Sequence, residues 1–245
     1  MSSAPTNVRD AVILAAGNGS RLSTVGYAPK PLVPVGGRPL IEYVTLALAA
    51  VGIRRVLIVS GYLGERLREW APRYTERLSV SFVQNSAYHR PNGLSLLCAE
   101  THARAPFLLV MADHVFEVDT LDRFLAQAGD RESILAVDRR VDAVFDASDA
   151  TRVVTENGRL RDIGKHLTRF DAIDTGIFLL GPGIFPALRA SEQAGDGSLS
   201  DGIARFAAAY GMDTWDIGDD PWIDVDTPLA LAEAERLVRA GFFAR

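Results

Sequence analysis

The chain has 245 residues, of which 48% are hydrophobic and 23% are charged, and its formal net charge is −5. This composition predicts a folded protein with one large domain or two small ones, and it excludes a disordered chain. The basic residues form no block, which excludes a binder of duplex nucleic acid but allows a small anionic ligand held by a few local cations.

Residues 1–10 (MSSAPTNVRD) lack the apolar core of a signal peptide, and no later apolar run approaches the ~20 residues of a membrane span. Strand-like runs rich in Val, Ile and Leu then alternate with helix-like segments. The runs lack polar alternation, which indicates burial on both faces of a mostly parallel sheet. The predicted strands are residues 11–16, 55–60, 80–84, 107–112 and 134–137, and the helices between the first four are 39–51, 64–74 and 93–103.

The pattern changes after about residue 138. The segment RVVTENGRLRDIG predicts a hairpin that turns at Asn157-Gly158, and a strand is predicted at 172–180. The fold class is α/β, a Rossmann-like, mostly parallel mixed sheet with helices on both faces. We expect one domain over residues 1–245, with an insertion or lid at about 138–215. The last helices are predicted at 182–193, 199–210 and 228–240.

The first motif, LAAGNGSRL, follows the first strand, where ligands of open α/β sheets bind. Gly17 and Gly19 suit a loop whose backbone N–H groups approach phosphate, and Arg21 adds positive charge. Leu22 replaces the third glycine of the dinucleotide fingerprint and no helix is expected directly after the loop, so a dinucleotide-binding dehydrogenase is disfavoured. A simple glycine turn is the alternative.

Lysine is rare in this chain. Of the 26 basic residues only Lys30 and Lys165 are lysine, which leaves 24 arginines. A lysine kept against this bias suggests a need for a compact ammonium, although two chance lysines are the alternative. Pro31 is expected to hold Lys30 extended, on a stiff arm.

Two segments carry candidate metal ligands. Asp113 closes the apolar run LLVMADH, where a carboxylate can bind a divalent cation that carries phosphates; a helix cap or loop acid is an equal alternative. His114 is expected to be structural, because magnesium seldom binds imidazole. In PWIDVDTP, Asp224 and Asp226 point to one side if the segment is extended. We expect Asp226 to cap the following helix and Asp224 to be the second metal ligand.

Taken together, L-A-A-G-x-G-x-R-L and P-K-P-L-x-x-V-x-G-x-P-L resemble the signature of nucleotidyltransferases that join an NTP to a sugar or alcohol phosphate and release pyrophosphate. The segments NGLSL, VMADH, DIGKHL, DAIDTG, SLSDGI and WIDVDTP extend the resemblance, in order, to the CTP:inositol-1-phosphate cytidylyltransferase family. That family is often fused to a membrane-embedded transferase. Phosphocholine and phosphonate cytidylyltransferases share much of the pattern, so the acceptor stays open.

The resemblance implies roles for these residues. Arg21 and Lys30 would act on the phosphates of CTP, and Asp113 and Asp224 would bind Mg²⁺, with Asp226 a weaker candidate. A turn and cap remains an equal alternative for Asn92, Gly93 and Ser95. The implied nucleotide-binding residues are Leu14, Ala15, Ala16, Gly17, Asn18, Gly19, Ser20, Asn92, Gly93, Ser95 and Ala112, and the implied acceptor-binding residues are Lys165, Asp174, Thr175 and Gly176.

Several alternatives and expectations accompany this interpretation. A sugar-1-phosphate nucleotidyltransferase that uses another NTP is the nearest rival, and a nucleotide-sensing pseudoenzyme is the rival outside the enzymes.

Cys98 alone cannot form an intramolecular disulfide and is expected to be a small buried residue on a helix. The expected protein is soluble and cytoplasmic, has no membrane span, and acts with a membrane CDP-alcohol transferase.

Overall fold

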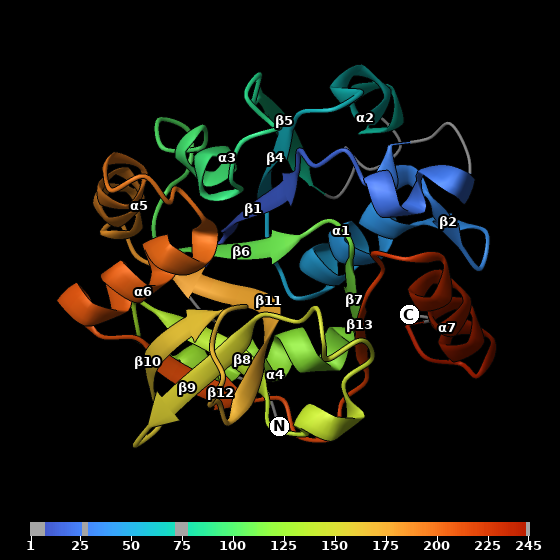
Figure 1. Cartoon of the computed structure of the whole chain (residues 1–245). Coiled ribbons are helices and arrows are strands. Elements are labelled where there is room, and N and C mark those ends of the chain that lie inside the picture. Colours follow the sequence, from blue (N-terminus) through green and yellow to red (C-terminus); the bar gives the residue numbers. More distant parts are fainter. Residues whose placement is uncertain (1–7, 26–28, 72–77, 244–245) are drawn as a thin grey trace.

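The computed structural model describes residues 8–25, 29–71 and 78–243. A nine-stranded mixed sheet forms its centre, with the strand order β5-β4-β1-β6-β11-β8-β12-β10-β9 (Figure 1). Four neighbouring strands are parallel, and the residues of the three inner ones are mostly buried, as the continuous apolar runs predict, whereas no residue of the edge strand at 79–84 is fully buried. They are β5 (Ser79–Gln84), β4 (Arg55–Ser60), β1 (Asp10–Ala15) and β6 (Phe107–Met111).

The second half of the sheet begins at β11 (Ala172–Leu180), which runs antiparallel to both β6 and β8 (Ile134–Asp138). β12 (Asp213–Asp216) runs parallel to β8 and joins it to the hairpin of β9 (Arg152–Glu156) and β10 (Arg159–Gly164). The hairpin turns at Asn157 and Gly158, whose φ angles of 51° and 74° are those of a two-residue primed turn. The predicted α/β class and the predicted hairpin are confirmed.

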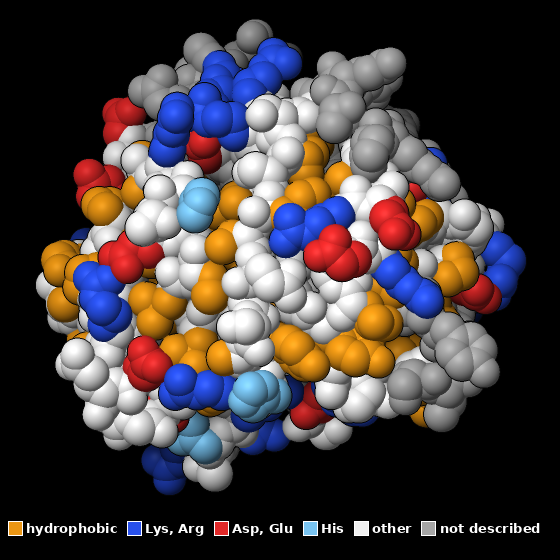
Figure 2. All heavy atoms as spheres, turned by 90° about the horizontal axis from the view of Figure 1, so that it is seen from above, with side chains coloured by type: hydrophobic (Ala, Val, Ile, Leu, Met, Phe, Trp, Pro, Cys, Tyr) orange, Lys and Arg blue, Asp and Glu red, His pale blue; other side chains and the backbone are white. Residues whose placement is uncertain are grey.

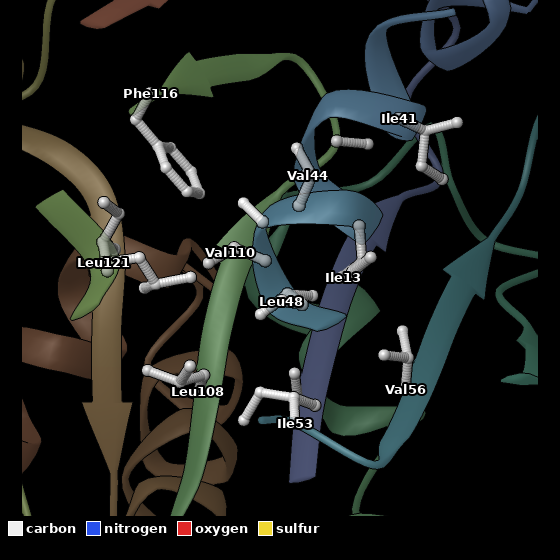
Figure 3. Close-up of a cluster of buried hydrophobic side chains, with 14 of the residues drawn as sticks. Ile13, Ile41, Val44, Leu48, Ile53, Val56, Leu108, Val110, Phe116 and Leu121 are labelled. Carbon is white, nitrogen blue, oxygen red and sulfur yellow. The ribbon is translucent and has the colours of Figure 1, made fainter. Parts of the chain in front are cut away.

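Helices cover both faces of the sheet. One face packs against α1 (Leu40–Ala50), α2 (Gly64–Trp70) and α4 (Val118–Ala128), and the other against α3 (Gly93–Leu97), α5 (Ile184–Gln193) and α6 (Leu199–Tyr210). Figure 3 shows Val44 and Leu48 of α1 next to Ile13 and Val110 of the sheet. Each such fully buried side chain contributes about 1.5–3 kcal/mol, so this core holds the strand ends in place.

A third apolar cluster joins the end of the chain to the segment after β6. β13 (Trp222–Asp224) pairs antiparallel with β7 (His114–Phe116), and α7 (Pro228–Arg239) packs beside them. The small ladder of β2 (Pro34–Val35) and β3 (Arg38–Pro39) completes the cluster, and short 3₁₀ helices lie at Ser20–Val25, Lys30–Leu32 and Val141–Ala143. Residues far apart in sequence thereby meet at the carboxyl end of β6.

Some elements differ from the sequence predictions. α3 ends at Leu97 rather than at residue 103, and Cys98 is a half-buried residue at the C-cap of α3 instead of a buried one within a helix. α4 and β12 were not predicted, and the end of the predicted helix 64–74 lies outside the described residues. Within the described part of the chain, no helix has the length and apolar character needed to cross a membrane.

Arginine supplies surface ion pairs throughout the molecule. Arg55 pairs with Asp10, Arg131 with Asp213 and Arg205 with Asp201, all at partly exposed positions. Figure 2 shows the corresponding pattern on one face, where basic and acidic side chains lie in neighbouring small groups between apolar ones. Such pairs contribute little to stability, about 0–1 kcal/mol each, so most arginines serve as plain surface charges.

Candidate active site

A cleft opens where β6 ends and β11 begins. This is the edge at which parallel strands present ligand-binding residues. The cleft is strongly acidic, and its basic lining residues include Lys165. The acidic lining residues are Asp113, Asp146, Asp149, Asp174, Asp224 and Asp226.

Lys30 lies buried beside this cleft. Its side chain is only 8% exposed, and its Nζ forms close ion pairs with Asp113 and Asp226 and lies 3.7 Å from Asp224 Oδ1. The prediction of an extended Lys30 is wrong, since the residue begins a 3₁₀ turn. Pro29 takes the extended conformation at the N-cap, and Pro31 is tolerated in the first turn because its missing N–H has no partner there anyway.

The glycine loop closes over the stem of this lysine. Gly19 has a φ of 59°, and a Cβ at this position would lie 2.5 Å from Lys30 Cβ, so only glycine fits. Asn18 Oδ1 accepts a hydrogen bond from the Ser20 N–H, and a 3₁₀ helix then starts at Ser20, contrary to the expectation that no helix follows directly. Gly17, Asn18 and Ser20 are exposed and remain accessible to a ligand.

Other predicted nucleotide-binding residues have backbone partners at the ends of the strands. The Ala112 N–H donates to the Leu14 carbonyl, and the Ala16 carbonyl accepts from the Tyr62 N–H, while Ala15 ends β1 in a buried position. Arg21 is half-exposed, donates to Asp149 Oδ2 at 2.5 Å and also pairs with Asp226. The loop side of the site is therefore ordered by contacts among its own residues.

Asp113, His114 and Asp224 form one cluster. His114 Nδ1 lies 2.9 Å from Asp113 Oδ1 and 3.8 Å from Asp224 Oδ1, and His114 pairs with Asp224 across the β7–β13 ladder. Burial lowers the pKa of His114, but the two carboxylates outweigh it and raise that pKa to about 9. Burial raises the pKa of Asp113, but Lys30 and His114 together hold it well below its usual range. The raised pKa favours the protonated imidazole, in which Nδ1–H can donate to Asp113 Oδ1.

The buried carboxylate of Asp138 binds Trp222, the residue on which His114 stacks. His114 stacks on Trp222 with ring centroids 5.8 Å apart, and Trp222 Nε1 donates to Asp138 at 2.9 Å. Asp138 is 2% exposed and also accepts from Arg140 Nη2 at 2.8 Å. The tryptophan is thus fixed at both ends, and the imidazole is held against Asp113.

The cluster fits a divalent cation. One ligand atom each from Asp113, His114 and Asp224 lie within 4.8 Å of one another. Asp224 Oδ1 is buried and has no hydrogen-bond partner among the described residues. Burial and the Asp113 carboxylate raise the pKa of Asp224, against the opposing charge of His114, so an added cation would relieve the cost of ionising it. The candidate metal ligands are therefore the two carboxylates, because His114 Nδ1 is engaged in a hydrogen bond with Asp113.

Asp226 does not cap the last helix. Thr227 is the N-cap of α7, where its side chain accepts a hydrogen bond from the Ala230 N–H at 3.1 Å. Asp226 instead turns toward the cleft and pairs with both Lys30 and Arg21. Asp224 and Asp226 do lie on one side of the chain, as the extended segment predicted, since both reach Lys30.

The second lysine lies in a different environment. Lys165 is 57% exposed, and its Nζ donates to Asp149 Oδ1 at 2.9 Å. Asp174 and Gly176 line the cleft with it, whereas the buried Thr175 hydroxyl donates to the Ala136 carbonyl within the sheet. Burial raises the pKa of Asp174 to about 6, against the Gly176 N–H and His114. The structure brings three of the four predicted acceptor residues to the cleft.

Residues near α3 join the two sides of the cleft. Asn92 lines it, and Asn92 Oδ1 accepts from the Leu199 N–H at 3.0 Å. A Cβ on Gly93 would lie 2.5 Å from the Gly197 carbonyl, which explains the glycine. Ser95 is buried and accepts from Asn85 Nδ2 at 2.9 Å. Asn92 is the N-cap residue of α3, but its side chain makes no capping hydrogen bond to that helix and instead contacts the start of α6.

Sequence reasoning missed two residues of the site. Asp149 contacts both Arg21 and Lys165, yet the surrounding letters DASDAT carry no recognised motif. Trp222 was quoted within PWIDVDTP without a role. An aromatic residue two positions before a candidate metal ligand on the same extended segment was the available signal, because alternate residues of a strand share a face.

Comparisons with known proteins place this geometry in a family. Residues 11–208 match the model of the MobA-like NTP transferase domain. The chain belongs to this family. The expected resemblance to nucleotidyltransferases is thereby confirmed.

Among curated relatives, the chain is 37% identical over 233 residues to the "Bifunctional IPC transferase and DIPP synthase" of Rubrobacter xylanophilus, covering 93% of this chain and 51% of the relative. It is 33% identical over 237 residues to the "CMP-5'-(3-aminopropyl)phosphonate synthase" of Streptomyces rubellomurinus, covering 89% of this chain and 37% of the relative. The chain thus spans about half or less of the length of these two relatives.

Solved structures agree with these sequence matches. The inositol-1-phosphate CTP transferase from T. maritima is similar with a TM-score of 0.79 and 25% identity, covering 96% of this chain and 97% of that one. A UDP-glucose pyrophosphorylase complexed with UDP-glucose has a TM-score of 0.82 at 18% identity, covering 96% and 99%, and supports the fold alone. The expected resemblance to the inositol-1-phosphate cytidylyltransferases is confirmed.

Proposed function

We propose that this chain transfers CMP from CTP to a phosphorylated polyol, with inositol 1-phosphate as the first candidate, and gives a CDP-alcohol and pyrophosphate. The observation that carries the proposal is the buried Lys30 among three carboxylates, with the exposed Lys165 beside the same cleft. The inositol-1-phosphate CTP transferase, similar over nearly the whole chain, supports the nucleotide and the acceptor.

The reaction is a substitution at the α-phosphorus of CTP. A phosphate oxygen of the acceptor forms the new P–O bond, and the bond to the β-phosphate breaks, with its electron pair leaving on pyrophosphate. A phosphate monoester has a second pKa near ~6 and is largely dianionic at neutral pH, so no general base is needed. The protein has to bring anions together and stabilise the charge that spreads in the transition state.

The residues divide this task between them. The loop from Gly17 to Arg21 would hold the β- and γ-phosphates through its exposed backbone and the guanidinium. Lys30, rigid because it is buried and paired, would meet the α-phosphate where charge develops. Lys165 would hold the acceptor phosphate, while the cleft-facing Asp174 carboxylate and Gly176 backbone would contact the acceptor body.

Asp113 and Asp224 would hold Mg²⁺, a hard cation that prefers carboxylate oxygens. When bound, the ion would neutralise charge on the phosphates and orient them. His114 would donate to Asp113 and keep that carboxylate aimed at the cluster. We propose that Leu14, Ala15, Ala16, Ala112, Asn92, Gly93 and Ser95 shape the nucleotide side of the cleft.

The location and partner of the chain belong to the same proposal. We infer a cytoplasmic enzyme in which residues 138–215 form the acceptor-binding part of a single domain. A membrane CDP-alcohol transferase would consume the product. The rivals are an aminophosphonate or phosphocholine acceptor, a sugar 1-phosphate with another NTP, and a nucleotide sensor without turnover.

A panel of substrates tests the proposal. The protein is incubated with Mg²⁺ and CTP together with inositol 1-phosphate, phosphocholine, 2-aminoethylphosphonate or glucose 1-phosphate, and pyrophosphate release is measured. UTP, GTP and dTTP replace CTP in a second series. We expect the fastest release with CTP and inositol 1-phosphate. Faster release with an aminophosphonate or with another NTP would replace the acceptor or nucleotide, and no release with any pair would favour the sensor.

A further inference from the structure

One carboxylate joins the two cations that the proposed function assigns to different substrates. Asp149 Oδ2 accepts from Arg21 Nη1 at 2.5 Å, and Asp149 Oδ1 accepts from Lys165 Nζ at 2.9 Å. Arg21 follows the glycine loop at the end of β1, whereas Lys165 directly follows β10. Two cations from different parts of the fold therefore converge on a single anion in the cleft.

The backbone around Asp149 is a defined turn. The Asp149 N–H donates to the Asp146 carbonyl at 3.0 Å, and Asp146, with a φ of 55°, accepts the Ser148 hydroxyl on its side chain at 2.8 Å. β9 begins three residues later, at Arg152. The carboxylate is thus presented from a short, hydrogen-bonded turn next to the sheet, and it lines the cleft.

The partners of the two cations differ in number. Arg21 also pairs with Asp226, but among the described residues Asp149 is the only acidic partner of Lys165. All three side chains are between about two-fifths and three-fifths exposed, at 48% for Arg21, 41% for Asp149 and 57% for Lys165. Ion pairs this exposed are weak and exchange readily with a competing anion.

We propose that Asp149 occupies the anion subsite between Arg21 and Lys165 and that a substrate phosphate displaces it. The proposal rests on the proposed function for the identity of that phosphate, the acceptor monoester. A carboxylate and a phosphate present similar oxygen acceptors to these donors, but a phosphate carries close to two negative charges at neutral pH. A monoester dianion therefore displaces Asp149, whereas a monovalent anion does not.

This arrangement couples the two substrates. Because one carboxylate holds both cations, an anion that takes Arg21 removes one of the two bonds that position Asp149, and Lys165 alone then holds the carboxylate in the subsite. CTP bound at the loop therefore leaves Lys165 more available to the acceptor phosphate, and the effect is reciprocal, as coupling between binding sites must be. Asp149 acts here as a positioning residue for Arg21 and Lys165 and touches no reacting atom.

Inorganic phosphate is the probe that tests the subsite without turnover. Its dissociation constant is measured by isothermal titration calorimetry for the wild-type chain, Asp149→Asn and Asp149→Ser. Asp142→Asn is the matched control, since Asp142 is an exposed acid before the same turn and does not line the cleft. We expect both Asp149 variants to bind phosphate about 3- to 10-fold more tightly, the range that two exposed ion pairs allow, and Asp142→Asn to match the wild type.

The double variant Asp149→Asn, Lys165→Ala locates the effect. The gain from Asp149→Asn should shrink at least about twofold when Lys165 is absent, because partners in one ion-pair network are not additive. Equal or weaker phosphate binding by both Asp149 variants would overturn the proposal. The same gain in Asp142→Asn would overturn it too, because a general loss of negative charge would then explain the result.

The kinetic coupling is measured in the wild type and Asp149→Asn with the best substrate pair of the panel. In the wild type, saturating CTP should lower KM for the acceptor, and in Asp149→Asn this dependence should be largely lost. An unchanged dependence would contradict the coupling. The calorimetry needs neither CTP nor turnover, so a chain that fails the substrate panel but shows the phosphate gain would refute the proposed function and leave the subsite standing.

Discussion

The two lysines of the chain lie in opposite environments within one site. Lys30 is 8% exposed and paired with three carboxylates, whereas Lys165 is 57% exposed and paired with one. A buried ion cluster depends on the surrounding core for its geometry and is expensive to disturb. An exposed pair can rearrange at little cost. The Lys30 side of the cleft is therefore built in advance, and the Lys165 side is adjustable.

Replacing the buried lysine is the most severe test of this comparison. Lys30→Ala should lower kcat by about 10²–10³-fold, since one donor to transition-state charge is worth about 2.7–4 kcal/mol. Lys30 lies outside the three apolar clusters, so circular dichroism should still show the native fold, with a lower free energy of unfolding because the carboxylates lose their buried cation. The rate of pyrophosphate release gives kcat, and a value near that of the wild type would disprove the mechanism.

Replacing Asp224, a candidate metal ligand, should lower activity nearly as much as replacing Lys30. Asp224→Asn keeps the shape of the side chain and removes the charge next to Asp113, so Mg²⁺ affinity should fall by at least about 10- to 100-fold, the loss seen even for outer partners of metal ligands. Calorimetry with Mg²⁺ measures the affinity directly, and activity should be lost in parallel. Asp219→Asn is the control, because Asp219 is fully exposed in the same loop; an equal loss there would contradict the assignment.

Gly176 tests how tightly the acceptor strand packs on the buried cluster. Its φ is 77°, and a Cβ would lie 2.6 Å from His114 Cδ2. Gly176→Ala should lower the free energy of unfolding by about 1–3 kcal/mol and weaken Mg²⁺ binding, because the imidazole must move. Gly158→Ala has a similar φ of 74° with nothing within 4 Å, so it isolates the backbone cost. Urea unfolding of both variants should show the larger loss for Gly176→Ala.

The exposed lysine should give the smallest effect. Lys165→Ala removes one charged hydrogen bond to the acceptor phosphate, worth about 1.5–3 kcal/mol, so KM for the acceptor should rise about tenfold or more while KM for CTP changes much less. Steady-state kinetics with each substrate varied separates the two constants. A KM effect confined to CTP would assign Lys165 to the other substrate.

The sequence predicted most of the sheet and the helices around it. β4 and α6 lie at the predicted residues, because a run of buried Val and Ile and an amphipathic segment after Ser198 are unambiguous local signals. α4 has comparable amphipathic spacing and was overlooked. β12 is short and only partly buried, so its place in the sheet follows from distant partners rather than from its own residues.

The sequence predicted candidate site residues that stand out by their type and position. It did not predict the contacts that those residues make with one another. Lys30, Asp113 and Asp224 stand out as isolated residue types at the ends of strands, and the structure brings them together. The prediction that Lys30 is extended was wrong because the rule for a residue before proline takes no account of the surrounding 3₁₀ turn. The prediction that Asp226 caps the last helix was wrong because Thr227 is the N-cap residue of α7. The contacts of Asp149 join segments far apart in sequence, so no local pattern predicted them.

The position of β12 has a consequence for how the chain folds during synthesis. The strand β12 lies between β8 and β10, although the chain reaches it only after β8, β9, β10 and β11 are complete. Until residues 213–216 emerge, the hairpin of β9 and β10 is attached to the sheet by its short pairing with β11 alone. Such late, non-local pairing is slow. The parallel half can form from the first 111 residues, whereas the hairpin side of the cleft and the Lys30 cluster, which needs Asp224 and Asp226, are completed only by the last part of the chain.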